Sequence, residues 1–246
     1  MSAPAIIFDR VCLEFAGKPL FQDLCLELEG GRCTCILGPS GCGKSTLLKL
    51  IAGSAALPFT GTISLDGQPT GGQQVAWMGQ NDLLLPWLSL IDNVLLGARL
   101  RHEVTETRRH KALALIAAAG LTGSEQALPK ALSGGMRQRG ALLRTLMEER
   151  PVLLMDEPFS ALDALTRVRL QNLSAKLTQG ATVVLVTHDP LEALRLADRI
   201  IVLAGTPVQV AEILDLGGLP PRDPGDSTVT GTYPGLLALL MNGEPV

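Results

Sequence analysis

The 246-residue sequence lacks several features that define whole classes of protein. It has no uncharged apolar run near the roughly 18–20 residues that a membrane-spanning helix needs, although hydrophobic residues make up 46% of the chain and the mean hydropathy is +0.28. The first ten residues contain no basic region followed by a long apolar stretch, so no secretory signal is predicted. We therefore expect a protein that stays in the cytosol.

A basic excess and a cysteine-rich metal motif are also missing. The formal net charge is −3 and the pI is near 5.7, which argues against a general nucleic-acid binder. All five cysteines lie within the first 42 residues, and neither a second cysteine pair nor a histidine cluster accompanies Cys33 and Cys35. An odd number of cysteines suits a reducing compartment. Cys33 and Cys35 are therefore interpreted as small buried hydrophobic residues.

A phosphate-binding loop, in contrast, is present in full. Residues 38–46 match the pattern G-x-x-x-x-G-K-[ST] without a mismatch: Gly38, Pro39, Ser40, Gly41, Cys42, Gly43, Lys44, Ser45 and Thr46. An apolar stretch that predicts a strand precedes the loop, and one at helical spacing follows it, closed by Gly53. These flanks favour the motif over the alternative, a glycine-rich turn with a chance lysine.

The chemistry of this loop follows from its geometry. Its glycines let successive backbone N–H groups converge on one point, and the following helix adds partial positive charge there. We predict that Lys44 reaches the β- and γ-phosphates and that the Ser45 hydroxyl ligates Mg²⁺. The protein is therefore expected to bind a nucleoside triphosphate.

The hydrophobic pattern predicts an α/β protein with a P-loop nucleotide-binding core and an N-terminal antiparallel β region. The distance along the chain from Lys44 to Asp156 is far longer than one βαβ unit needs. We interpret residues 81–150 as a helical insertion into a core of about 1–80 and 151–210, followed by a C-terminal tail, 211–246. Strands are expected at 5–8, 11–15, 24–28, 33–37, 61–67, 75–78, 152–155, 182–186 and, as the last one, 199–203, with helices at 90–120, 136–149, 164–178 and 190–197.

Two carboxylates, Asp156 and Glu157, end the apolar stretch 152–155. At the carboxyl end of a parallel strand beside the phosphate loop, Asp156 can hold the Mg²⁺ shell. Glu157 can orient or deprotonate the attacking water. The alternative is a strand end with two solvated acids, and the complete phosphate loop favours the catalytic interpretation.

A third motif places small groups at the start of a predicted helix. Ser133, Gly134 and Gly135 offer a hydroxyl and free backbone N–H donors, which together make another anion site. A simple helix cap after a flexible loop is the alternative.

Together these motifs resemble the ATP-binding subunit of an ABC transporter over about residues 5–210. Residues 132–138 resemble the signature motif of that family, with Met136 in place of its glutamine, and residues 158–163, which end at Asp163, resemble its D-loop region. The resemblance implies a RecA-like core, an ATPase activity, and ATP and Mg²⁺ as ligands.

Three single residues extend the resemblance. His188 is similar to the switch histidine, which implies a hydrogen bond to the γ-phosphate or to the attacking water. Gln80 is similar to the Q-loop glutamine at the Mg²⁺ shell. Phe15 is similar to the aromatic residue that stacks on adenine, although an ordinary core position is an equally good interpretation. Glu157, His188 and Lys44 are thus the expected catalytic residues.

The resemblance also implies partners. In the family, two copies sandwich two ATP molecules, each phosphate loop facing the Ser133–Gly135 segment of the other copy, so a homodimer is expected. The apolar segment Leu83–Leu90 follows Gln80 where family members meet a membrane permease, and Trp87 is the expected contact; packing within the insertion is the alternative for its leucines.

Residues 80–94 resemble the importer subgroup for nitrate, sulfonates, taurine and thiamine-precursor pyrimidines, and residues 97–101 lean toward the pyrimidine branch. The resemblance implies a peripheral protein on the cytoplasmic face of the membrane, coupled through the permease to a periplasmic or extracellular solute-binding protein. A soluble ABC-type ATPase that acts on nucleic acid or the ribosome is the alternative, which the single cassette and the acidic pI disfavour.

Overall fold

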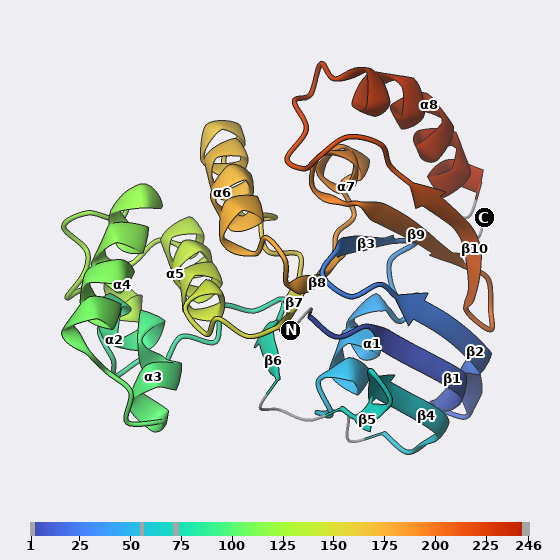
Figure 1. Ribbon diagram of the computed structural model, residues 1–246, viewed down its shortest axis with the longest axis horizontal. Helices are drawn as coiled ribbons and strands as arrows, with labels where there is room; N and C mark the ends of the chain where they lie inside the picture. Colours follow the sequence, from blue (N-terminus) through green and yellow to red (C-terminus); the bar gives the residue numbers. More distant parts are fainter. Residues whose placement is uncertain (1–2, 55–56, 71–73, 243–246) are drawn as a thin grey trace.

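A computed structural model describes residues 3–54, 57–70 and 74–242. The first two residues of the predicted core and the last four of the predicted tail lie outside this range. The described chain contains a four-stranded and a six-stranded sheet, with helices around them (Figure 1).

The four-stranded sheet is antiparallel and has the order β2-β1-β4-β5. Its strands are β1 (Ile6–Phe15), β2 (Lys18–Leu28), β4 (Phe59–Leu65) and β5 (Gln68–Pro69). The prediction of separate strands at 5–8 and 11–15 is wrong, because a bulge at Arg10, whose φ is 48°, joins them into one strand. The extra residue shifts the alternation, so that Phe8 and Val11 both face the core.

The six-stranded sheet has the order β10-β9-β3-β8-β7-β6 and is parallel except for its edge strand β10. Its strands are β3 (Cys33–Leu37), β6 (Val75–Met78), β7 (Val152–Asp156), β8 (Thr182–Val186), β9 (Arg199–Ala204) and β10 (Gln209–Asp215). The predicted parallel sheet is confirmed. The prediction of 199–203 as the last strand is wrong, because β10 follows it; as a mostly exposed edge strand, β10 has no buried apolar run to mark it.

Alternate residues of the central strands face two separate cores. Val152 and Leu154 pack toward α1 (Lys44–Ile51) and the antiparallel sheet, whereas Leu153 and Met155 pack on the opposite side. That opposite side is covered by α6 (Ala164–Leu177), α7 (Pro190–Leu196) and α8 (Ser227–Asn242) (Figure 1). Burial on both faces explains why these strands read as continuous apolar runs in the sequence.

The chain between β6 and β7 is helical and lies beside the sheet (Figure 1). Its helices are α2 (Leu90–Val94), α3 (Leu96–Leu100), α4 (Glu106–Ala118), the short 3₁₀ helix η1 (Pro129–Ala131) and α5 (Gly134–Leu146). No helix in the described ranges combines the length and the apolar composition needed to cross a membrane.

The predicted C-terminal tail is structured from 211 to 242. α8 packs Val229 and Leu236 into the core on the α6 and α7 side of the sheet. Arg222, which is buried, donates hydrogen bonds to the carbonyls of Leu194 at 3.1 Å and Ala197 at 2.6 Å, at the end of α7. This arginine therefore fastens the C-terminal segment to α7.

Candidate nucleotide-binding and hydrolysis site

The phosphate loop connects β3 to α1 and encloses the ammonium group of Lys44. Lys44 is buried, and its Nζ donates to the carbonyls of Gly38 at 2.8 Å and Pro39 at 2.7 Å. Gly43 caps α1 with a φ of 89°, and a Cβ there would lie 3.1 Å from Leu20. The left-handed backbone and the crowding both favour glycine. The positive charge of Lys44 is thus fixed by loop carbonyls at the N-terminus of α1, where a phosphate group would be favoured.

Asp156 ends β7 close to this loop and is buried. Burial is the largest effect on the pKa of Asp156 and raises it, and the nearby charge of Glu157 raises it further. A hydrogen bond with the Ser45 hydroxyl and the positive charge of Lys44 lower this pKa, but they do not cancel the effect of burial. A buried carboxylate whose charge is incompletely compensated, beside a hydroxyl, fits a hard divalent cation such as Mg²⁺. No three His, Cys, Asp or Glu side chains of the described residues form a metal site on their own, so the remaining ligands would include nucleotide oxygens and water.

Glu157 and His188 meet at the carboxyl ends of the neighbouring strands β7 and β8. The Nδ1 atom of His188 lies 3.3 Å from Oε1 of Glu157. Glu157 has a φ of 50°, and its N–H donates to the carbonyl of Val186 at 2.8 Å, which fixes this uncommon backbone conformation. The His188 side chain is 64% exposed, whereas that of Glu157 is 22% exposed. The backbone of Glu157 is therefore fixed, and its partly buried carboxylate lies beside a mostly exposed imidazole.

Two further predicted residues, Phe15 and Gln80, are exposed. Phe15 ends β1 and is 60% exposed, which argues against the core interpretation and leaves its ring free to stack. Gln80 follows β6 and is exposed, and no hydrogen bond among the described residues involves its side chain.

The signature segment forms the start of α5. Ser133 caps this helix, its Oγ accepting from the N–H of Met136 at 3.3 Å, and Ser133 and Gly134 are exposed. Asp163 caps α6, and hydrogen bonds from Thr166 lower its pKa. Within the described chain, no hydrogen bond joins Ser133, Gly135 or Asp163 to the phosphate loop. Ser133 and Asp163 therefore serve as helix caps within their own chain.

Gln138, the last residue of the segment that resembles the signature motif, was given no role of its own by the sequence analysis, and it connects the signature helix to the catalytic segment. Its Nε2 donates to the carbonyl of Glu157 at 3.0 Å and to Oγ of Ser160 at 3.1 Å, and its Oε1 accepts from the N–H of Ala161 at 2.8 Å. Gln138 is 6% exposed. A glutamine within a functional motif and on the buried face of an amphipathic helix was the signal available in the sequence.

Comparisons with known sequences identify close relatives. The sequence profile of the family described as ABC transporter matches residues 21–160. The taurine import ATP-binding protein TauB of Yersinia pestis bv. Antiqua is 43% identical over 207 residues, which are 82% of this chain and 81% of that protein. The aliphatic sulfonates import ATP-binding protein SsuB 1 of Rhodococcus jostii is 43% identical over 227 residues, which are 92% of this chain and 89% of that protein.

A similar solved structure is the dimeric post-hydrolysis state of the ATP-binding cassette MJ0796 bound to ADP and Pi. Its TM-score is 0.77 at 30% sequence identity, and the match covers 87% of this chain and all of that chain. The predicted α/β fold and the family resemblance are thereby confirmed. Since the family profile spans more than half of the sequence and these relatives cover over four-fifths of it, the chain belongs to the ABC transporter family, as an ATP-hydrolysing, ATP-binding subunit.

Proposed function

We propose that this ABC importer ATPase powers the uptake of a small organic sulfonate through a membrane permease. The observation that carries this proposal is the identity of about 43% to taurine and aliphatic sulfonate import ATP-binding proteins. The resemblance of residues 97–101 to the pyrimidine branch is weaker evidence for the solute, because the permease and the solute-binding protein choose the solute. None of the relatives named above supports an action on nucleic acid or the ribosome.

The roles of the site residues form the second part of the proposal. Lys44 and the loop N–H groups bind the β- and γ-phosphates, and Phe15 stacks on adenine. Ser45, Asp156 and Gln80 hold Mg²⁺, which supplies positive charge at the phosphate oxygens when bound. All nine loop residues, Gly38 to Thr46, line the phosphate position.

For the hydrolysis step, Glu157 accepts a hydrogen bond or a proton from the attacking water. His188 lies 3.3 Å from that carboxylate, where it can hold the water or a phosphate oxygen. The fixed backbone of Glu157 keeps its carboxylate in one place as the water approaches.

We further propose that a second copy completes each site. Ser133 and Gly134 are exposed, and MJ0796 is dimeric in its ADP-bound state. Asp163, at the start of α6, would lie near the same interface. In a symmetric dimer, each phosphate loop then receives the signature segment of the partner.

The permease contact is proposed on the helical insertion, residues 81–150, beside the core of 1–80 and 151–210. Leu83, Trp87 and Leu100 are 60%, 70% and 74% exposed. Arg144 donates to the carbonyls of Asp82 and Leu83, which ties α5 to the start of this segment. Buried Asn93 donates to the carbonyls of Leu85, Leu88 and Ser89, so the segment Leu83–Leu90 has a fixed shape.

A groove beside this segment supports the same proposal. It is lined by Trp77, Leu96, Gly97, Leu100, Arg144, Thr145 and Glu148. The indole N–H of Trp77 is buried and has no hydrogen-bond partner among the described residues. A groove that mixes apolar and polar side chains and has an unpaired donor at its wall suits a helix end that offers a backbone carbonyl. The chain would then be a peripheral protein at the cytoplasmic face, linked through the permease to a solute-binding protein.

Uptake of labelled taurine and of an aliphatic sulfonate tests the solute class. Cells that lack the gene should lose uptake of at least one of them, wild-type protein should restore it, and Glu157→Gln should not. Normal uptake of both sulfonates in the deletion strain, together with loss of nitrate or pyrimidine-precursor uptake, would overturn the proposed class.

Trp87→Ala tests the permease contact. ATP binding should be unchanged, because Trp87 belongs to the exposed insertion segment, whereas solute uptake should fall by roughly tenfold. Phe59→Ala, also at an exposed aromatic residue, is the control. Uptake that is equal in the two variants would contradict the contact.

A further inference from the structure

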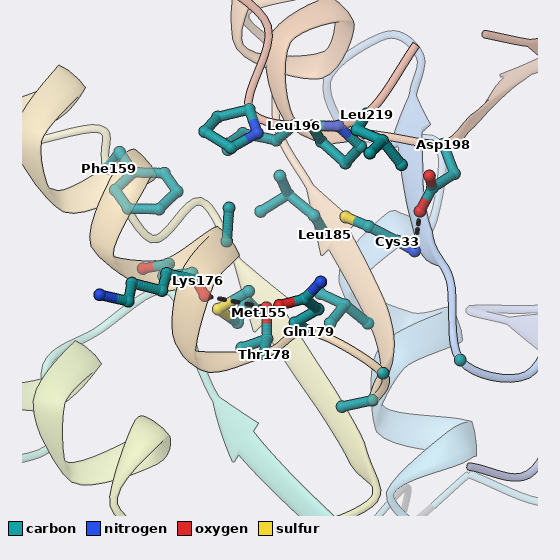
Figure 2. Close-up of a pocket in the computed structure, with 18 residues that line it drawn as sticks. Cys33, Met155, Phe159, Lys176, Thr178, Gln179, Leu185, Leu196, Asp198 and Leu219 are labelled. Atoms are coloured by element: carbon teal, nitrogen blue, oxygen red, sulfur yellow. Dashed lines mark hydrogen bonds between the residues drawn. The ribbon is translucent and has the colours of Figure 1, made fainter. Parts of the chain in front are cut away.

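A cavity of 380 Å³ lies on the α6 and α7 side of the six-stranded sheet, opposite α1 (Figure 2). Phe159, Leu185 and Leu196 give it a mainly apolar lining. Its volume lies in the range of pockets that hold small-molecule ligands. It is separate from the phosphate loop, whose residues do not contribute to its wall.

The cavity extends along the sheet toward the catalytic carboxylates. One end is formed by Cys33 and Val183, near the starts of β3 and β8, and by Leu219, which is 89% exposed. The other end reaches Met155 and Phe159. Met155 immediately precedes Asp156, and Phe159 follows Glu157 by two residues. A molecule in the cavity would therefore contact the back of the catalytic segment.

The lining includes a buried hydroxyl group that is not satisfied by the protein. Ser174 lies on α6 and is 3% exposed, and its Oγ has no hydrogen-bond partner among the described residues. The neighbouring hydroxyl of Thr178 donates instead to the carbonyl of Ser174 at 2.9 Å. Buried hydroxyls are ordinarily paired. The free Ser174 group thus indicates that a ligand supplies the missing partner.

The charges around the cavity favour an uncharged ligand. Burial raises the pKa of the Cys33 thiol to about 12, so this group is neutral at physiological pH. The carboxylate of Asp198 lines the same end, where its Oδ2 accepts from the N–H of Cys33 at 2.8 Å. Lys176 extends from the opposite side of the cavity in Figure 2 and is exposed, so solvent screens its charge. Buried Arg222 interacts electrostatically with Asp198 and with Cys33, so the positive and negative charges at this end offset each other. An anion in the cavity would therefore find no unpaired buried cation among the described residues that line this end.

The two helices that border the cavity each begin at a catalytic segment. α6 follows Asp163, and α7 follows His188 and its cap Asp189. Arg167 pairs with Asp189 at 3.2 Å, and Gln171 donates to Glu192 at 3.1 Å. Arg195, in the last turn of α7, also donates to Gln171 and to Oδ1 of Asn172 at 3.2 Å. These contacts tie α7 to the middle of α6, directly before the cavity wall at Ser174 and Ala175.

We propose that this cavity binds an uncharged, mainly apolar small molecule that hydrogen-bonds to Ser174. Its binding changes the rate of ATP hydrolysis without displacing ATP, because it fixes α6 and α7 and so the placement of His188 and of the segment after Glu157. This regulatory site goes beyond the proposed import function.

Indole, 2-naphthol and the anionic 2-naphthoate serve as probes, with binding to the full-length protein measured by calorimetry. We expect saturable binding of indole or 2-naphthol with a Kd below about 1 mM, and at least tenfold weaker binding of 2-naphthoate. Absence of saturable binding would overturn the site, and equal binding of the anion would overturn the charge argument.

Two variants locate the binding. Ala175→Phe fills the cavity from α6 and should weaken binding at least tenfold, whereas Ala117→Phe, at an exposed alanine of α4, should leave it unchanged. Thermal unfolding and ATP binding check that each variant is folded. Ser174→Ala, which leaves the cavity open, should weaken binding roughly three- to tenfold. Binding that is unaltered in Ser174→Ala and in folded Ala175→Phe would overturn the assignment.

Steady-state hydrolysis tests the regulatory part separately. At saturating indole or 2-naphthol, kcat should change at least twofold while the KM for ATP stays constant, and Ala175→Phe should abolish the change. An unchanged kcat with proven binding would refute the coupling, and competition with ATP would refute a separate site. Neither outcome bears on whether the protein drives sulfonate import.

Discussion

The phosphate loop and the signature segment, Ser133–Gly135, both offer hydrogen-bond donors for phosphate, but they differ in burial and in hydrogen bonding within the chain. At the loop, Lys44 is buried and has two carbonyl acceptors, and Glu157 lies beside His188. At the signature segment, Ser133 and Gly134 are exposed and bond within their own helix. Donors that are exposed and unoccupied by their own chain are available to a second molecule. The difference supports the proposal that one chain builds most of a hydrolysis site and that its copy supplies the remainder.

Lys44→Ala should give the largest effect, because it removes the charge that the loop encloses. We expect ATP hydrolysis to fall about 100- to 1,000-fold, measured as phosphate release. Lys49→Ala is the matched control, since Lys49 lies on the same helix but is exposed. A comparable loss in the two variants would show that the enclosed position of Lys44 has no special role.

Gly134→Asp tests whether the signature segment acts on a second copy. A Cβ at Gly134 would meet only the tip of Arg137, 3.9 Å away, so folding should be unaffected. A carboxylate facing the phosphates of the partner should lower hydrolysis by about 100-fold. Gly225→Asp, at another open glycine, is the control. If Gly134→Asp hydrolyses ATP normally, the proposed arrangement of the dimer is wrong.

Gln138→Ala tests the link between the two regions within one chain. Loss of the hydrogen bonds to Glu157, Ser160 and Ala161 should lower kcat about tenfold and leave ATP affinity unchanged, since the phosphate loop is untouched. Thr145→Ala, which removes another buried polar group from α5, is the control. A weaker affinity with an unchanged kcat would contradict a positioning role.

Phe15→Ala should weaken ATP binding about five- to tenfold, through loss of stacking on the base. Stability should change little, because the ring is mostly exposed. Affinity for ATP and for inorganic triphosphate should be compared by calorimetry. An equal loss for both ligands would argue against stacking.

Glu192→Gln should give a modest effect on stability that depends on pH. Burial raises the pKa of Glu192 from 4.5 to about 7. The folded state therefore keeps a proton that the unfolded state releases, so wild-type stability falls as pH rises from about 4.5 to above 7. Relative to the variant, the wild type should lose about 2–3 kcal/mol between pH 5 and pH 8. Urea unfolding at several pH values measures this loss of stability, and Glu212→Gln, at an exposed glutamate, is the control. If the stability of the wild type and of Glu192→Gln changes with pH in parallel, the raised pKa of Glu192 is refuted.

The parts of the fold that could be predicted are those whose residues carry strong local patterns. The strands at 33–37, 75–78 and 182–186 begin and end as predicted. Those at 33–37 and 182–186 lie inside the sheet and are buried on both faces, which needs continuous apolar runs. The bulge at Arg10 and the edge strand β10 were not predictable in this way. Both depend on pairing with a neighbouring strand, which leaves no periodic signal in their own residues.

The sequence by itself determined the family, the phosphate loop and the two carboxylates, because phosphate and metal binding require particular residue types at short, fixed spacings. Only the tertiary structure decided that His188 reaches Glu157, that Gln138 supports the catalytic segment, and that Ser133 and Gly134 are exposed at the start of α5. The physical reason is that these relations join residues far apart in the chain. They arise from the order of the strands and from the helices packed on them, which short motifs do not encode.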